Sequence, residues 1–161
     1  MPEATPLHDL TNRLGAVFAD EADSTVPLHF GDPAAEYETT RTAASLFDRS
    51  HRGKVELTGK EAASFLHNLS SNDIVGLPLG GGCEIFLTTN KAKVVAHGYV
   101  FHIRLHDGSP ALWLDLPPGT SETVIKHLDH FLISEQVEFA DCTREFAPVS
   151  YTPLRAHETK A

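Results

Sequence analysis

The sequence predicts an α+β fold with a mostly antiparallel sheet, and three observations support this prediction. Five stretches have the composition and alternation of strands: 54–57, 83–88, 93–103, 111–116 and 137–142. Residues 58–69 and 120–132 place apolar side chains at helical spacing. The resulting order is strand, helix, strand, strand, strand, helix, strand. We therefore expect a split β-α-β (ferredoxin-like) core with one extra strand and with helices packed on one face of the sheet.

Residues 53–74 form the unit on which we expect the rest of the fold to pack. Thr58 and Glu61 stand three residues apart and predict a capping box, which satisfies backbone donors at the start of a helix. The helix then has one apolar face, made by Ala62, Phe65, Leu66 and Leu69. The short polar side chains of residues 70–73 favour hydrogen bonds to nearby backbone, so the helix is expected to end there.

Two further helices are predicted before this unit. The first begins at Thr5-Pro6, a cap followed by proline, and its apolar stripe continues to about Ala19. The second follows a similar signal at Asp32-Pro33 and is expected to end at Ala44. Between and after them we expect a polar loop and two short extended segments, over residues 20–25, 26–30 and 46–48.

The bulk composition is that of an ordinary globular protein of 161 residues, long enough for one domain with a substantial core. The net charge of −9 disfavours a broad electrostatic footprint for nucleic acid, so no direct nucleic-acid partner is expected. No apolar run approaches the roughly 20 residues that span a bilayer, so no membrane partner is expected either. Cys83 and Cys142 are far apart in the sequence and no signal peptide is recognisable. Both features indicate a reducing, cytoplasmic location.

The carboxyl end differs from the rest of the chain. Residues 149–161 resemble a translated sequencing-library adaptor, so we expect a non-native tail there. The native domain would then cover residues 1–148 as a fragment of a larger protein, with a carboxyl-terminal domain missing.

The stretch LFDRSHRGKVELTGKEAASFLHNLSSNDI resembles the amino-terminal domain of the glycine-cleavage T-protein family. This family includes aminomethyltransferases and their non-catalytic folate-binding relatives of the YgfZ type. The resemblance covers roughly Val26 to Thr143 and implies that tetrahydrofolate is the ligand. It also implies a folate-binding-type domain, with reduced folate as the partner.

The resemblance implies that the family's key acid lies on the second strand of a hairpin, in a G-G-x-x-D-D pattern. The predicted strands 83–88 and 93–103 correspond to this hairpin. A carboxylate there can orient the folate nitrogen and stabilise positive charge on the one-carbon adduct. Alignment of the hairpin turns places Ala96 and His97 at the two aspartates, and a one-residue shift would place His97 at the first. Residues 90–105 contain no aspartate or glutamate. We therefore expect no catalytic residue in this chain.

The missing acid favours a non-catalytic folate-binding protein of the YgfZ type. The resemblance implies that such a protein supports iron–sulfur cluster maintenance and enzymes that modify transfer RNA, which would be its protein partners. The motif K-G-C-x-x-G-Q-E of that branch is not in the sequence. One alternative is an aminomethyltransferase of the glycine cleavage system, which transfers a one-carbon unit to tetrahydrofolate, with Asp48 or Asp73 as a displaced acid. A second alternative is an interaction domain that binds no folate, with an apolar, filled cleft around Ala96.

Four residues are candidates for contact with the folate: Asn72, Asp73, Glu84 and His97. Asn72 and Asp73 match a T-N-D-I turn of the family, although their residue types also favour turns without any ligand. Glu84 stands near a tyrosine of the aminomethyltransferases that stacks on folate, and the alternative for Glu84 is an exposed strand residue.

No metal site is predicted. His102 and His106, with Asp107, would share one face of a strand, and His127 and His130, with Asp129, would share a helix. Neither set has a third ligand at a familiar spacing, so we expect solvated polar faces.

Overall fold

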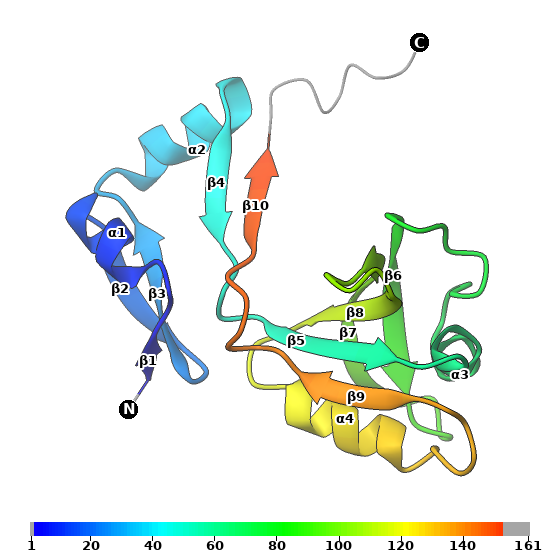
Figure 1. Cartoon of the computed structure of the whole chain (residues 1–161). Helices are drawn as coiled ribbons and strands as arrows, with labels where there is room; N and C mark the ends of the chain where they lie inside the picture. The colour runs from blue at the N-terminus through cyan, green and yellow to red at the C-terminus, as the bar shows by residue number, and fades with distance from the viewer. Residues whose placement is uncertain (1, 153–161) are drawn as a thin grey trace. The chain divides into compact units, whose positions relative to one another are not determined.

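The computed structural model describes residues 2–152, which divide into two units of contacting residues. The first, here called the sheet unit, covers residues 52–143. The second, here called the terminal unit, combines residues 2–51 with residues 144–152. Figure 1 shows the elements of both units, and each unit is described by itself.

The sheet unit contains one five-stranded antiparallel sheet in the order β6-β7-β8-β5-β9 (Figure 1). Its elements are β5 (Gly53–Thr58), α3 (Ala62–Leu69), β6 (Gly82–Thr88), β7 (Val94–Arg104), β8 (Pro110–Leu116), α4 (Ser121–Asp129) and β9 (Glu138–Asp141). This order of elements is the one that the sequence predicts. The α+β class and the mostly antiparallel sheet are confirmed.

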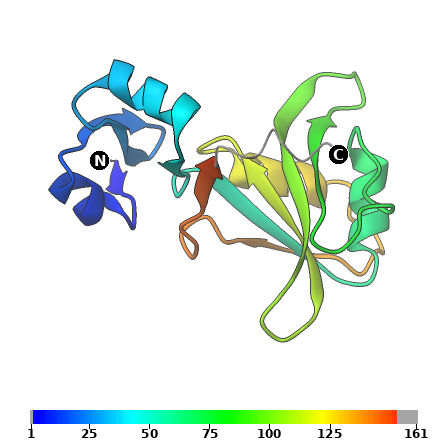
Figure 2. The same cartoon turned by 90° about the horizontal axis from the view of Figure 1, so that it is seen from above.

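A single apolar core lies between one face of this sheet and the two helices. Alternate residues of each strand face it, such as Val55 and Leu57 of β5, which are fully buried. Helix α3 contributes Leu66, and α4 contributes Val124 and Leu128. Both helices therefore cover the same face of the sheet, and the opposite face of the sheet carries no helix of this unit (Figure 2).

The capping box predicted at Thr58 is wrong. Strand β5 continues through Thr58, and Gly59 follows with φ +110°, a conformation that favours glycine. Helix α3 then begins at Ala62 without a side-chain cap. The Glu61 carboxylate accepts a hydrogen bond from the backbone N–H of Gln136 at 2.7 Å instead, so it ties α3 to the start of β9.

The terminal unit contains two small sheets and two helices. Its elements are β1 (Glu3–Ala4), α1 (His8–Arg13), β2 (Val17–Glu21), β3 (Ser24–His29), α2 (Pro33–Thr42), β4 (Ser45–Asp48) and β10 (Val149–Thr152). One sheet has the order β1-β3-β2, and the other pairs β4 with β10. Helix α2 begins as predicted, since the Asp32 side chain accepts hydrogen bonds from the N–H groups of Ala34 and Ala35.

The first predicted helix is too long. Helix α1 ends at Arg13, and Gly15 has φ +84°, which breaks the helical path. From Val17 the chain forms β2 and pairs with β3, so the polar loop expected over residues 20–25 shrinks to a tight turn at Ala22 and Asp23. The apolar stripe failed as a helix signal because valine and phenylalanine also favour strands.

Strand β10 lies within the predicted tail. Its residues pair with β4 from Val149 opposite Asp48 to Thr152 opposite Ser45. Residues 153–161 of that tail lie outside the described residues, and the tail and the 1–148 boundary stay predictions.

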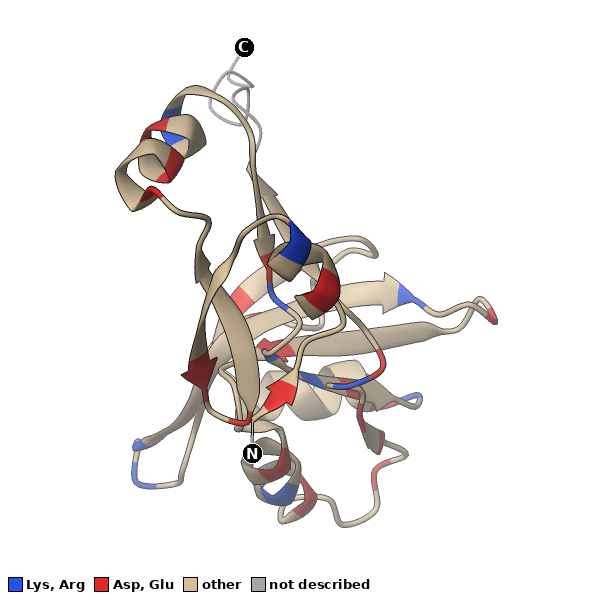
Figure 3. Ribbon diagram, turned by 90° about the vertical axis from the view of Figure 1, so that its left-hand side faces the viewer, with Lys and Arg blue, Asp and Glu red and all other residues tan. Residues whose placement is uncertain are grey.

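Three of the four described helices carry charged residues of both signs. Helices α1, α2 and α4 each carry acidic and basic side chains (Figure 3). Across residues 2–152, no helix has both the length and the apolar character needed to cross a bilayer.

Candidate functional site

Aromatic side chains gather on the face of the sheet opposite α3 and α4. We call this surface the aromatic face and define it by Glu84, Phe86, His97, Tyr99, Phe101 and Trp113, from β6, β7 and β8. These residues share one face because alternate strand residues point the same way and the cross-strand partners are in register. Phe86, Tyr99 and Phe101 are each about 40% exposed. Three large rings exposed on one face make this surface a candidate for ligand or partner binding.

His97 stands at the centre of one group on this face. Its Nε2 lies 2.7 Å from Oε1 of Glu84, and its ring stacks on Phe86 with centroids 4.7 Å apart and planes 19° apart. The Tyr99 ring lies tilted at 6.1 Å on the same strand. The imidazole is therefore held by a carboxylate at one atom and by aromatic rings around it.

A second group continues the aromatic face toward β5. The Phe101 ring lies over Gly82, where an added Cβ would come within 2.6 Å of the ring. Nε1 of Trp113 donates a hydrogen bond to the Glu56 carboxylate at 3.0 Å. Farther along β8, Nε of Arg52 donates to Oδ1 of Asp115 at 2.5 Å. Charged side chains thus flank the exposed rings.

Ala96 does not lie on the aromatic face. Its side chain is 6% exposed and belongs to the core between the sheet and the helices. The hairpin register shifts between Leu87 and Thr88, and Ala92 in the turn has φ +56°, so the alignment of turns did not fix which residue faces outward. His97 is the residue of this pair that lies on the uncovered side. The apolar, filled cleft considered around Ala96 is therefore core packing and not a ligand cleft.

Asn72 and Asp73 form the turn after α3. The Asn72 side-chain amide donates to the backbone oxygen of Glu84 at 3.1 Å, so it holds the strand that carries this acid. Oδ1 of Asp73 accepts from the N–H of Gly76 at 2.9 Å, and it also lies 3.4 Å from Nδ1 of His67. The structure thus brings Glu84 and His97 together, links Asn72 to them through backbone, and places Asp73 in its own turn.

Cys83 offers no reactive thiolate to this site. Burial raises the pKa of its thiol above the ordinary value, and the nearby charge of Asp73 raises it further. A thiol with a raised pKa is a weak nucleophile near neutral pH.

Two histidines outside the aromatic face, His102 and His127, have partly buried surroundings. Nδ1 of His102 lies 2.9 Å from the backbone oxygen of Leu77, and β7 ends at Arg104, so the prediction that His106 shares a strand face with His102 is wrong. Burial is the main cause that lowers the pKa of His127. Residues 2–152 contain no group of three or more histidine, cysteine, aspartate or glutamate side chains able to hold a metal ion.

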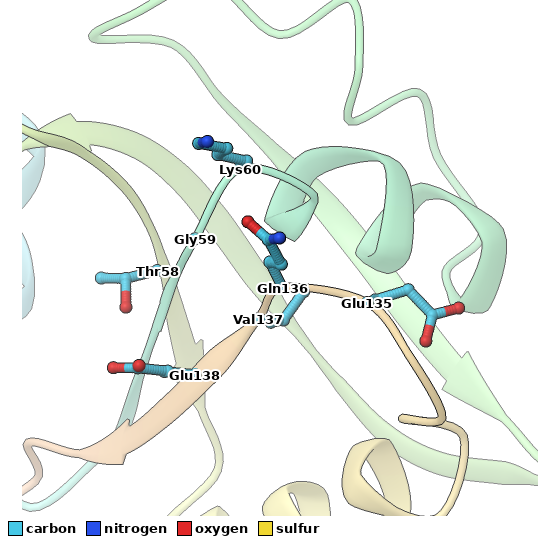
Figure 4. Close-up of a pocket in the computed structure, with 7 residues that line it drawn as sticks. All are labelled: Thr58, Gly59, Lys60, Glu135, Gln136, Val137 and Glu138. Atoms are coloured by element: carbon cyan, nitrogen blue, oxygen red, sulfur yellow. The ribbon is translucent and has the colours of Figure 1, made fainter.

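A polar depression of about 490 Å³ lies elsewhere in the sheet unit, where β5 ends and β9 begins (Figure 4). Its lining residues are Thr58, Gly59, Lys60, Glu135, Gln136, Val137 and Glu138. In Figure 4 the Glu135 side chain points away from Thr58 and Glu138. Because its polar groups diverge and no ring lines it, this depression is a weaker candidate than the aromatic face.

Comparison with known proteins assigns the family. The family model described as "GCVT N-terminal domain" matches residues 7–151. The chain therefore belongs to the GCVT N-terminal domain family. An aminomethyltransferase of Bacillus velezensis is 40% identical over 80 residues, which cover 50% of this chain and 22% of that protein. An aminomethyltransferase of Bacillus subtilis is 41% identical over 80 residues, with the same shares of the two chains.

A solved structure shows the same fold. The glycine cleavage system aminomethyltransferase T from Bartonella henselae superposes with a TM-score of 0.79 at 20% identity, covering 94% of this chain and 41% of that one. The matched residues thus cover 22% of each of the two curated relatives and 41% of the solved chain, so the present chain matches only part of each of these proteins.

These relatives overturn the functional reading drawn from the sequence. The expectation of a non-catalytic YgfZ-type protein that supports iron–sulfur enzymes is wrong, because the similar proteins are named aminomethyltransferases. The expectation that the chain is not part of an enzyme is wrong for the same reason. Ala96 lies in the core, so its lack of a carboxylate says nothing about the exposed face, although residues 90–105 contain no aspartate or glutamate at all.

The sequence predicts Glu84 and His97 as site residues but not the four rings of Phe86, Tyr99, Phe101 and Trp113 beside them. The available signal was the strict alternation of β7, which places His97, Tyr99 and Phe101 on one side.

Proposed function

We propose that this chain is the amino-terminal part of an aminomethyltransferase and that its aromatic face binds tetrahydrofolate. The main observation that supports this proposal is the set of exposed rings of Phe86, Tyr99 and Phe101 around the His97–Glu84 pair. A pterin is a flat heterocycle with N–H groups on its edge. Stacked or edge-to-face ring contacts contribute about 0.5–1.5 kcal/mol each beyond the area they bury, so three exposed rings suit such a ligand.

The polar groups of the aromatic face supply orientation. The Glu84 carboxylate is half exposed and can accept hydrogen bonds from pterin N–H groups in addition to the one from His97. Asn72 supports this geometry through its hydrogen bond to the backbone of Glu84, which makes it a positioning residue. Asp73, the next residue, stabilises the same turn by accepting a hydrogen bond from the backbone N–H of Gly76.

In the whole protein, a carboxyl-terminal domain would complete the pocket above this face. The coverage supports this extension, since the matched residues make up 22% of each curated relative and 41% of the solved chain. The two cysteines are present as thiols, which favours a reducing cytoplasmic setting.

Calorimetric titration with tetrahydrofolate tests the proposal. Phe101→Leu keeps an apolar side chain but removes a ring, and we expect it to weaken binding about two- to tenfold. Ile133→Ser is the matched control, because Ile133 is an apolar residue 90% exposed outside the aromatic face. Absence of binding in the unmodified protein, or equal loss in both variants, would refute the proposed ligand site.

A further inference from the structure

The contacts of His97 fix the position of its proton as well as its ring. An ionised carboxylate only accepts hydrogen bonds, so the 2.7 Å contact to Glu84 requires the hydrogen of a neutral imidazole to be on Nε2. The Phe86 ring stacks on the imidazole and restricts its rotation. The second ring nitrogen, Nδ1, then carries a lone pair.

This lone pair is available. Within residues 2–152, Nδ1 of His97 makes no hydrogen bond, and the His97 side chain is 45% exposed. The arrangement is that of a carboxylate-oriented histidine, in which one nitrogen is held by an acid and the other can accept a proton.

The other polar groups of this region are already engaged. The Asp115 carboxylate is bound by Arg52, and the Glu56 carboxylate accepts from the Trp113 indole. Tyr99, two residues along β7 from His97, contributes a phenol hydroxyl, which is a hydrogen-bond donor and a weak acceptor. Among the described side chains of this face, Glu84 is already paired with Nε2 of His97, and Nδ1 of His97 is the nitrogen base that has no hydrogen-bond partner.

We propose that Nδ1 of His97 accepts the proton released when tetrahydrofolate takes up the one-carbon unit, with Glu84 as the positioning residue. This inference rests on the proposed function. In the step, the lone pair of a folate nitrogen forms a bond to the methylene carbon of a protonated aminomethyl group. The old carbon–nitrogen bond breaks with its electron pair going to ammonia, and the methylene carbon stays bonded to its carrier during this step. The proton on the attacking nitrogen passes to Nδ1, and the resulting imidazolium is stabilised by the Glu84 carboxylate.

Kinetics of the intact protein test this assignment. A positioned base contributes about 10²–10⁴-fold, so His97→Ala should lower kcat by that factor while changing the affinity for tetrahydrofolate far less. Added imidazole should restore part of the kcat of His97→Ala. His106→Ala is the control, because His106 is an exposed histidine in the turn after β7 and should leave kcat unchanged.

The role of Glu84 has its own readout. Glu84→Gln keeps an oxygen that can accept from Nε2–H, whereas Glu84→Ala removes it. Nitrogen-15 NMR of neutral His97 should show the Nε2–H tautomer in the unmodified protein and in Glu84→Gln, and a mixture of tautomers in Glu84→Ala. The kcat should fall more in Glu84→Ala than in Glu84→Gln.

Three results would overturn the inference. One is full kcat in His97→Ala, and another is an Nδ1–H tautomer in the unmodified protein. The third is a fall in the kcat of His97→Ala that imidazole does not restore, together with an equal fall in the affinity for tetrahydrofolate. This result would show that the role of His97 is structural. If the unmodified protein forms no methylenetetrahydrofolate, the proposed function falls as well, so the two failures are distinguishable.

Discussion

Gly59→Ala should destabilise the sheet unit more than the same substitution at a glycine whose added Cβ would meet no other atom. Gly59 has φ +110°, and a Cβ there would overlap the carbonyl oxygen of Gln136 and lie 2.8 Å from its carbon. A non-glycine residue in this region of φ costs about 1–2 kcal/mol by itself. Moving Gln136 away would also break its hydrogen bond to the Glu61 carboxylate, a charge-assisted contact of about 1.5–3 kcal/mol. We expect a loss of about 3–5 kcal/mol in the free energy of unfolding.

Gly108→Ala separates the two contributions. Gly108 also has positive φ, at +88°, but an added Cβ would meet nothing within 4 Å. Its cost should therefore be the conformational strain alone, about 1–2 kcal/mol. Urea unfolding of both variants, followed by circular dichroism, measures the difference. A loss in Gly59→Ala no larger than that in Gly108→Ala would refute the close approach of β5 and the segment before β9.

Three further outcomes are expected. Gly82→Ala should displace the ring of Phe101 and weaken tetrahydrofolate binding about as much as Phe101→Leu does, and calorimetry would contradict this if affinity were unchanged. Burial lowers the pKa of His127 in the folded protein, so the unfolded chain binds more protons below about pH 6.5 and stability should fall as pH drops through that range. His127→Leu should show a shallower fall between pH 7.5 and 5.5, and equal slopes would exclude this role. Asp73→Asn removes a charge that raises the pKa of the Cys83 thiol, so alkylation of Cys83 at pH 8 should become faster.

The sheet unit could be predicted from sequence because its local and long-range signals agree. Val55 and Leu57 alternate with polar neighbours, and the core lies on the side to which they point. In α3, Phe65 and Leu66 lie on the predicted apolar face and are buried. Periodicity alone therefore identified the strands, the helices and the buried side of each.

The terminal unit was harder because its apolar residues are not tied to a large core. Leu14 and Val17 are exposed in the structure, and the segment that contains them leaves the helix at Gly15 to join a small sheet. The segment forms a strand because β2 pairs with β3. This contact between two segments is not visible in the local pattern of apolar residues. The capping box failed for a similar reason, since Glu61 is engaged by Gln136, a residue 75 positions away.

The candidate site was predicted only in part. The family resemblance indicates Glu84 and His97 separately, whereas their contact depends on the register between β6 and β7. The hairpin bulge and the positive φ of Ala92 shift that register, and neither has a clear sequence signal. A one-residue shift exchanges the two faces of a strand, so it decided whether Ala96 or His97 faced outward.

The central claim is that the aromatic face binds tetrahydrofolate. NMR chemical-shift mapping during a tetrahydrofolate titration tests it most directly. We predict that the largest shifts fall on His97, Tyr99 and Phe101, with little change at Gly59 beside the polar depression. Shifts concentrated at the depression or on α3 and α4, or no shifts at all, would contradict the account.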